Sequence, residues 1–221
     1  MAHQIFSAII LDCETGGLNP NIEATCSVSL TSISLLDGTE ISKYTSFIKP
    51  YGNLQYHQKA MDFTGITMVQ LMKGKDVKQV VADLIEEFKK AHIAKGAVKP
   101  VLVGHNIGFD IGFIQKMFDF CKADYSKLLS CNLDGYGHYV PQSFDTMWLS
   151  RMKYNIDLAM QKYTLTACCE KNGIALTDAH DAANDVLSTK EMFLLYMNQL
   201  RNNSEGSAAV KKERKRDYWK I

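Results

Sequence analysis

The feature that most constrains the fold is a pair of short, continuous apolar runs. IFSAIIL occupies residues 5–11 and PVLVGHN occupies residues 100–106. Runs of this length without polar alternation are typical of strands that are buried on both faces of a sheet. Because helices cover both faces of such a sheet, we expect an α/β domain.

Further elements can be placed around these two strands. CSVSLTSISLL (26–36) and ISKYTSFI (41–48) flank Asp37-Gly38, and together with 5–11 they predict a β-meander. Apolar residues at helical spacing predict helices over 77–94, 109–121, 163–172 and 181–201. Residues 143–152 are predicted to form a short strand that leads into a helix. The Gly-rich, polar segment 130–142 is predicted to be a loop. This order predicts a central mixed five-stranded sheet flanked by helices.

Composition limits the class of protein. The 221 residues suit one domain, and no apolar run approaches the ~18 residues of a membrane span. The N-terminus does not read as a secretion signal, because its apolar run ends in acidic residues. The six cysteines include no CxxC pair, so we expect free thiols in a reducing, cytoplasmic setting.

Charge is distributed unevenly along the chain. KKERKRDYWK (211–220) has a net charge of +4, which leaves −3 for the rest of a chain whose total is +1. NNSEGSAA (202–209) has the composition of a flexible linker. We therefore expect a folded domain over 1–201 and a linker with a basic tail over 202–221. The tail could bind phosphates, dock on a protein, or remain a solvated end.

Acidic residues follow the first buried strand. Asp12 and Glu14 are two residues apart, so on an extended strand they share a face at a spacing of roughly 6.7 Å. Two buried carboxylates repel each other, and a divalent cation such as Mg²⁺ removes that repulsion. Thr15-Gly16-Gly17-Leu18 then forms a tight turn beside them. Alone, the acidic pair also fits a solvated, inert junction.

Two further motifs carry acids. Asp110 ends GHNIGFD (104–110), in the first turn of an expected helix, where an acid also simply favours the helix N-terminus. His180 and Asp185 bracket HDAAND, and on one continuous helix they would point about 140° apart. They converge only if His180 precedes the regular helix, for which Asp178 is a candidate N-cap.

Taken together, these motifs carry a family resemblance. LDCETGGLNP (11–20), GHNIGFDIGFI (104–114) and AHDAANDV (179–186) resemble the three motifs of the DnaQ-like DEDDh 3′→5′ exonucleases. FDTMWLSR (144–151) and DFTGIT (62–67) match two further segments. The resemblance covers about residues 4–201 and implies a ribonuclease H-like fold.

The resemblance also implies roles for individual residues. Four acids would bind two divalent cations, Mg²⁺ or Mn²⁺, and these are Asp12, Glu14, Asp110 and Asp185. His180 would act as the general base. Contacts to the 3′-terminal nucleotide would come from Thr15, Gly16, Leu18, Phe63, Thr64 and Phe109. Thr64 stands where many relatives have histidine, so this sequence departs from the family pattern at that contact.

The implied activity is metal-dependent hydrolysis of phosphodiester bonds from a free 3′ end. We expect single-stranded DNA as the substrate, in proofreading or end trimming, with a DNA polymerase as a candidate partner. An RNA exonuclease of the oligoribonuclease or RNase T kind is the first alternative. A catalytically inactive nucleic-acid-binding module is the second.

Overall fold

The structure of the chain is a computed structural model that describes residues 4–93, 97–176 and 181–205. Five strands form the main sheet, in the spatial order β3-β2-β1-β4-β7. Their bounds are β1 (Ser7–Thr15), β2 (Thr25–Ser34), β3 (Glu40–Phe47), β4 (Val101–Gly104) and β7 (Ser143–Asp145). β1 pairs antiparallel with β2 and parallel with β4, so the predicted mixed five-stranded sheet is confirmed.

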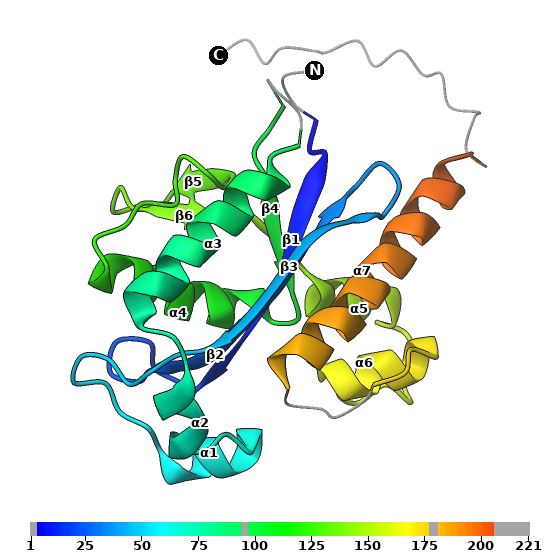
Figure 1. Cartoon of the computed structure of the whole chain (residues 1–221). Coiled ribbons are helices and arrows are strands. Elements are labelled where there is room, and N and C mark those ends of the chain that lie inside the picture. The colour runs from blue at the N-terminus through cyan, green and yellow to red at the C-terminus, as the bar shows by residue number, and fades with distance from the viewer. Residues whose placement is uncertain (1–3, 94–96, 177–180, 206–221) are drawn as a thin grey trace, which may run out of the picture.

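Helices cover both faces of this sheet, as expected (Figure 1). α3 (Val77–Ala91) and α4 (Ile107–Phe120) lie on one face. On the other side lie α5 (Thr146–Lys153), α6 (Leu165–Asn172) and α7 (Ala182–Glu205). Two short helices, α1 (Gln58–Thr64) and α2 (Met68–Lys73), sit at one end of the sheet.

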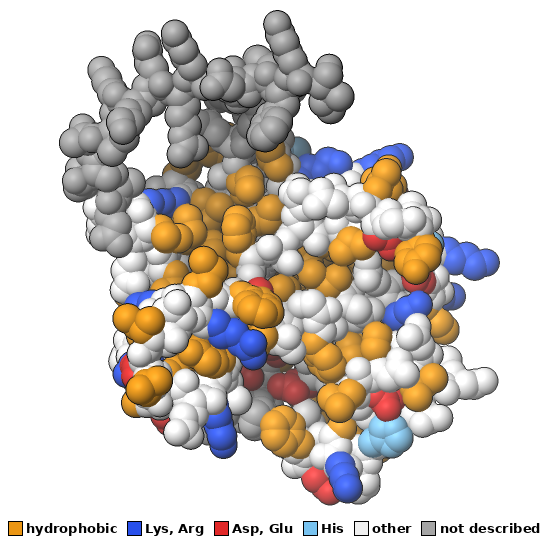
Figure 2. Space-filling model, turned by 180° about the vertical axis from the view of Figure 1, so that it is seen from behind, with side chains coloured by type: hydrophobic (Ala, Val, Ile, Leu, Met, Phe, Trp, Pro, Cys, Tyr) orange, Lys and Arg blue, Asp and Glu red, His pale blue; other side chains and the backbone are white. Residues whose placement is uncertain are grey.

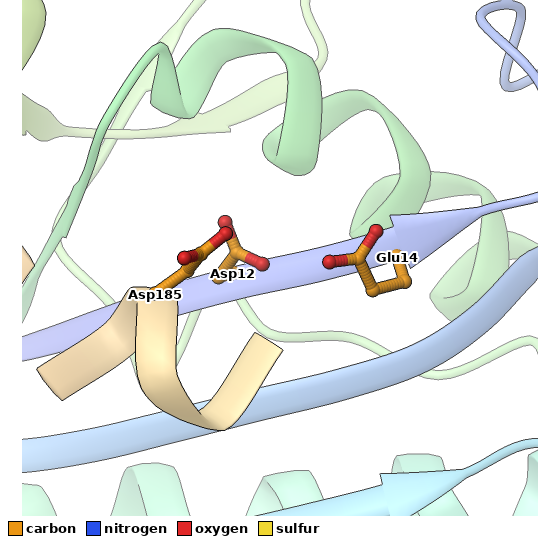
Figure 3. A group of neighbouring side chains, drawn as sticks. All are labelled: Asp12, Glu14 and Asp185. Carbon is orange, nitrogen blue, oxygen red and sulfur yellow. The ribbon is translucent and has the colours of Figure 1, made fainter. Parts of the chain in front are cut away.

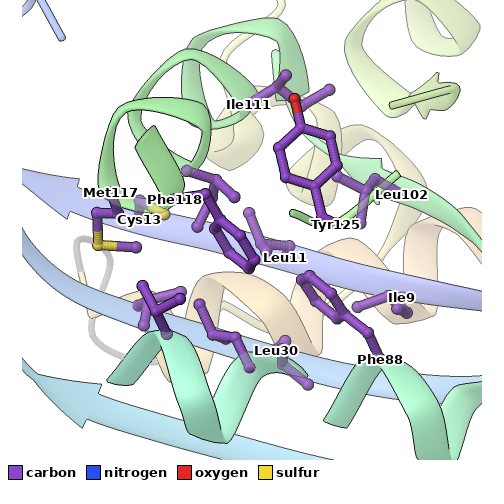
Figure 4. Close-up of a cluster of buried hydrophobic side chains, with 14 of the residues drawn as sticks. Ile9, Leu11, Cys13, Leu30, Phe88, Leu102, Ile111, Met117, Phe118 and Tyr125 are labelled. Carbon is purple, nitrogen blue, oxygen red and sulfur yellow. The ribbon is translucent and has the colours of Figure 1, made fainter. Parts of the chain in front are cut away.

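The central strand β1 divides its side chains between the two faces, because successive residues of a strand point in opposite directions. Ile9, Leu11 and Cys13 pack into the core beneath α3 and α4, against side chains such as Phe88 and Phe118 (Figure 4). Ala8 and Ile10 pack instead with Val186 and Phe193 of α7. The next residues on this second face are Asp12 and Glu14, so the two acids point toward α7.

β1 is longer than its apolar run. The strand was expected over 5–11, but its pairing with β2 continues through Asp12 opposite Ser29 and Glu14 opposite Ser27. A register shift between Glu14 and Thr15 then ends the regular pairing. The residues opposite the two acids on β2 are therefore serines, which have small polar side chains.

The prediction of an irregular loop at 130–142 was wrong. This segment contains a two-stranded hairpin, β5 (Cys131–Leu133) and β6 (Tyr139–Pro141). Asp134 holds the turn, since its Oδ1 accepts hydrogen bonds from the backbone N–H groups of Tyr136 and His138, both at 2.8 Å. Gly and polar residues therefore mark a tight turn here and not an open connection.

Element boundaries also differ from the expected ones. α3 ends at Ala91, before the expected residue 94. α7 continues to Glu205, so residues 202–205 of the expected linker are helical. Residues 62–67 span the end of α1 and the connection to α2. The basic tail lies outside the described residues. No helix in the described part of the chain is both long and apolar enough to cross a membrane.

Candidate active site

Three of the four predicted metal ligands converge between β1 and α7. Asp12 and Glu14 project from β1, and Asp185 projects from the first turn of α7 (Figure 3). One carboxylate oxygen from each residue lies within 4.8 Å of the others. The Asp12 and Asp185 carboxylates lie side by side, with the Glu14 carboxylate turned toward them.

The start of α7 places Asp185 at this point. Asp181 caps the helix, because its Oδ1 accepts hydrogen bonds from the N–H groups of Ala183 (2.9 Å) and Asn184 (3.2 Å). Its carbonyl accepts from the N–H of Asp185 at 2.9 Å. Asp181 therefore has the capping role that we expected of Asp178, which, like His180, lies outside the described residues. The helix begins at Ala182, so residue 180 precedes its first turn in the chain.

The fourth acid, Asp110, approaches the same strand from α4. Its side chain is 4% exposed, and its Oδ1 accepts a 2.9 Å hydrogen bond from the N–H of Cys13. α4 can start this close to the sheet because β4 ends in Gly104, where a Cβ would lie 2.6 Å from Cδ1 of Ile107. Asp110 is not one of the three acids that meet within 4.8 Å.

Burial and mutual repulsion raise the pKa of three of these acids, Asp12, Glu14 and Asp110. Burial, followed by the charges of Asp185 and Asp181, raises the pKa of Asp12 to about 7. Burial and then the charge of Asp12 raise the pKa of Glu14 to about 8. The pKa of Asp110 is raised as well, by burial first and Asp12 second. A cluster of buried and half-buried carboxylates, three of them with raised pKa values, fits a hard divalent cation, which would stabilise the ionised forms.

A pocket of about 660 Å³ opens beside Glu14. Five of the six predicted nucleotide-contacting residues line it, namely Thr15, Leu18, Phe63, Thr64 and Phe109. Leu18 and Phe63 are large apolar side chains that are 84% and 65% exposed, respectively. Gly16 is absent from the lining, and its N–H donates to the carbonyl of Ala24 at 2.8 Å.

Glu23 and His57 also line this pocket, and the sequence analysis did not identify them. Glu23 is 6% exposed and accepts a 2.6 Å hydrogen bond from the N–H of Asn19. The Nε2 atom of His57 lies 2.6 Å from Oε1 of Glu23, an ion pair when the imidazole is protonated. This pair braces the turn that carries Leu18. The two residues are 34 positions apart and belong to no shared motif, so only the fold brings them together.

The site thus has the acidic side chains of Asp12, Glu14 and Asp185 at its base and apolar side chains such as Leu18 and Phe63 along its sides. Figure 2 shows acidic side chains at the bottom of a hollow, with hydrophobic and basic side chains around its rim. A phosphate could reach the acids only with bound cations, whereas a base would meet apolar surface. This arrangement suits the end of a nucleotide chain, with its phosphodiester at the acids and its terminal base in the pocket.

Similarity to known proteins agrees with this geometry. The model of the exonuclease family RNase T matches residues 9–193. A ribonuclease T from Shewanella frigidimarina (strain NCIMB 400) is 27% identical over 197 residues, which cover 86% of this chain and 82% of that protein.

Solved structures share the fold. E. coli exonuclease I in complex with a dT13 oligonucleotide superposes with a TM-score of 0.71 at 19% identity, covering 91% of this chain and 43% of that one. The zinc-bound form of its complex with single-stranded DNA gives a TM-score of 0.73, also at 19% identity, covering 92% of this chain and 43% of that one. The chain therefore spans less than half the length of exonuclease I.

Proposed function

The chain belongs to the RNase T exonuclease family, and we propose that it removes nucleotides from the 3′ end of single-stranded nucleic acid. Family membership confirms the resemblance that its motifs carry, and makes the chain an exonuclease. The single observation that carries the proposal is the convergence of Asp12, Glu14 and Asp185 within 4.8 Å beside the apolar-walled pocket.

In this proposal the four acids hold two divalent cations, Mg²⁺ or Mn²⁺. Asp12, Glu14 and Asp185 are the central ligands, and Asp110 completes the set from α4. Bound cations would supply an activated water and stabilise the charge on the leaving 3′-oxygen. His180 precedes α7 in the chain and accepts the proton of the attacking water. Leu18 and Phe63 hold the terminal base between apolar surfaces.

DNA is the substrate that we propose first, in end trimming or in proofreading beside a polymerase. The structural likeness to exonuclease I supports it, since the matched structures contain dT13 and single-stranded DNA. RNA is the second candidate, because the relative from Shewanella frigidimarina is named ribonuclease T. Both substrates present the same phosphodiester to the acids. The free thiols of all six cysteines suit the cytoplasm as the place of action.

The experiment that tests the proposal uses single-stranded dT10 and U10, each labelled at the 5′ end. With Mg²⁺ or Mn²⁺ we expect a ladder of labelled products that shorten from the 3′ end, together with released mononucleotides. The rates on the two strands establish the preferred sugar. EDTA and Asp185→Asn should each abolish the ladder. Internal cleavage, or full activity in EDTA, would contradict the proposal.

A further inference from the structure

A cluster of one cation and two aromatic rings lies on α5 and the segment before α6. Arg151 stands between the rings of Trp148 and Tyr163, with its guanidinium carbon 4.9 Å and 5.5 Å from their centroids. Trp148 and Arg151 are three residues apart on α5, so their side chains share one side of the helix. Trp148 remains 57% exposed. Cation–π contacts therefore hold a guanidinium in a fixed position at the surface.

Hydrogen bonds link the segments that carry this cluster to the edge of the pocket beside Glu14, which we call the nucleotide pocket. Asn106 lines that pocket, and its N–H donates a 3.0 Å hydrogen bond to Oδ1 of Asp145, the residue that caps α5. Next to Asn106, Nε2 of His105 donates a 2.8 Å hydrogen bond to the carbonyl of Tyr163. Both parts of the cluster are thus fixed to the residues that connect β4 to α4. Asn106 at the edge of the pocket and the cluster are therefore linked through these two hydrogen bonds.

The charge of Arg151 is available to an anion. None of the salt bridges among the described residues involves its guanidinium, which two aromatic rings hold in place of an acid. A guanidinium presents several N–H donors in a plane, the geometry that binds a phosphate through two oxygens. The exposed indole beside it offers a flat face to a base.

We propose that Trp148, Arg151 and Tyr163 form a binding site for the nucleotide chain upstream of the bond that is cut. Arg151 binds a backbone phosphate, and the indole of Trp148 stacks on an adjacent base. Tyr163 holds the guanidinium in position from the other side. This inference rests on the proposed function, and it assigns to α5 the recognition of a polynucleotide as opposed to a single nucleotide.

The test measures how activity grows with substrate length. kcat/KM is determined for thymidine 5′-monophosphate p-nitrophenyl ester and for dT2, dT4 and dT8, with U2, U4 and U8 as the RNA arm. The variants are Trp148→Leu, which removes the stacking face, and Arg151→Gln, which removes the charge. In each we expect the ratio of kcat/KM for dT8 to that for the ester to fall at least tenfold. Arg151→Gln should also make the slope of log affinity against log salt shallower by about 0.7.

Two matched controls lie away from α5. Tyr136→Leu removes an aromatic ring that is 88% exposed on the β5–β6 hairpin, and Lys89→Gln removes an exposed cation on α3. Both should keep the wild-type ratio. Thermal melting of each variant identifies loss of folding. If Trp148→Leu has a lowered melting temperature, the test rests on Arg151→Gln and on its slope of log affinity against log salt.

The outcomes separate this inference from the function on which it rests. If the wild-type protein hydrolyses neither the ester nor any oligonucleotide with Mg²⁺ or Mn²⁺, the proposed function fails. If it hydrolyses both, and Arg151→Gln keeps the wild-type ratio and salt slope, the proposed function stands and the upstream site is refuted. Equal losses on the ester and on dT8 would give the cluster a structural role only, which also refutes it. If the variants lower the ratio of kcat/KM for U8 to that for the ester, but leave the dT8 ratio unchanged, the strand bound by the cluster is RNA.

Discussion

The Oδ1 atom of Asp110 accepts a 2.9 Å hydrogen bond from the backbone N–H of Cys13, the residue between Asp12 and Glu14. A carboxylate on α4 is thereby fixed to the strand that supplies two other acids. Asp110 consequently has two separable properties. Its oxygen completes a buried hydrogen bond, and its negative charge adds to the cluster.

Asparagine and alanine at position 110 separate these properties. Asp110→Asn keeps an oxygen that can accept from Cys13 and removes a buried charge, so we expect at least wild-type stability in EDTA but a loss of exonuclease activity of about 100-fold or more. Asp110→Ala leaves the Cys13 N–H without that acceptor and should also cost about 1–3 kcal/mol of stability. Urea unfolding and initial rates on labelled dT10 measure both effects. Wild-type turnover in Asp110→Asn would exclude this residue from the metal site.

The metal-free protein should become less stable as the pH rises. The folded-state pKa is raised to about 7 for Asp12 and to about 8 for Glu14, from ordinary values of 3.8 and 4.5. At a pH between the ordinary and the raised pKa of each acid, the folded state binds more protons than the unfolded state. The free energy of unfolding therefore falls from about pH 4 to pH 8. Bound Mn²⁺ or Mg²⁺ should remove most of this slope, because a cation favours the ionised acids.

The measurement is urea unfolding at pH 5, 6, 7 and 8, in EDTA and in excess metal. Asp12→Asn/Glu14→Gln provides the control, since it removes two of the three acids whose pKa is raised and should make the slope of the EDTA curve shallower. Identical slopes with and without metal would show that these acids do not bind it.

Truncating the exposed apolar side chains of the pocket should weaken substrate binding without unfolding the domain. Leu18 and Phe63 are mostly solvent-exposed, so Leu18→Ala and Phe63→Ala remove little buried surface. We expect melting temperatures within error of wild type and a raised KM for dT10 in both variants, by about 5- to 100-fold for Phe63→Ala, which loses an aromatic ring that can stack on a base. Leu36→Ala, which truncates another exposed leucine outside the pocket lining, is the matched control. Unchanged KM in both pocket variants would show that the terminal base does not bind against Leu18 and Phe63.

Local sequence patterns were enough to predict the sheet and the acids on it. An apolar run predicts a buried strand directly, and the fixed alternation of a strand puts Asp12 and Glu14 on one face. The position of Asp110 follows from a helix that begins directly after β4. Family membership and fold are confirmed, whereas the roles of the individual acids stay predictions.

Features that depend on contacts distant in sequence could not be predicted. The pairing of Glu23 with His57 arises only when α1 packs beside the turn that carries Leu18. The hairpin within 130–142 and the helices α1 and α2 could not be predicted for a different reason, because they are shorter than the windows in which periodicity is visible.

The role of His180 and that of the basic tail also remain predictions, since both lie outside the described residues.

His180→Ala should lower turnover more than binding. If its imidazole takes the proton of the attacking water, the wild-type rate rises with pH around the ordinary histidine pKa of about 6.5, and the variant loses this rise together with at least about 100-fold in kcat. The pH profile of kcat between 5.5 and 8.5, at saturating Mn²⁺, measures it. His138→Ala, an exposed histidine on the hairpin, should keep the wild-type profile. A wild-type profile in His180→Ala would assign the base to another group.

Gly17→Ala should disturb the turn that carries Leu18 by displacing Glu23. A Cβ at this position would lie 2.6 Å from Oε1 of Glu23 and closer still to its Oε2. That carboxylate is buried and held by Asn19 and His57, so it cannot move aside without losing both contacts. We expect a destabilisation of about 1–3 kcal/mol and a higher KM for dT10.

A double-mutant cycle tests whether Glu23 is the cause. Glu23→Ser removes the obstructing carboxylate, so Gly17→Ala should have little further effect on stability in that background, although it is harmful alone. Gly135→Ala is the control, because a Cβ there meets no atom within 4 Å and should change stability by no more than about 0.5 kcal/mol. Equal effects of Gly17→Ala with and without the Glu23 carboxylate would show that the strain arises elsewhere. Loss of that effect would establish that the clash with the Glu23 carboxylate is its cause.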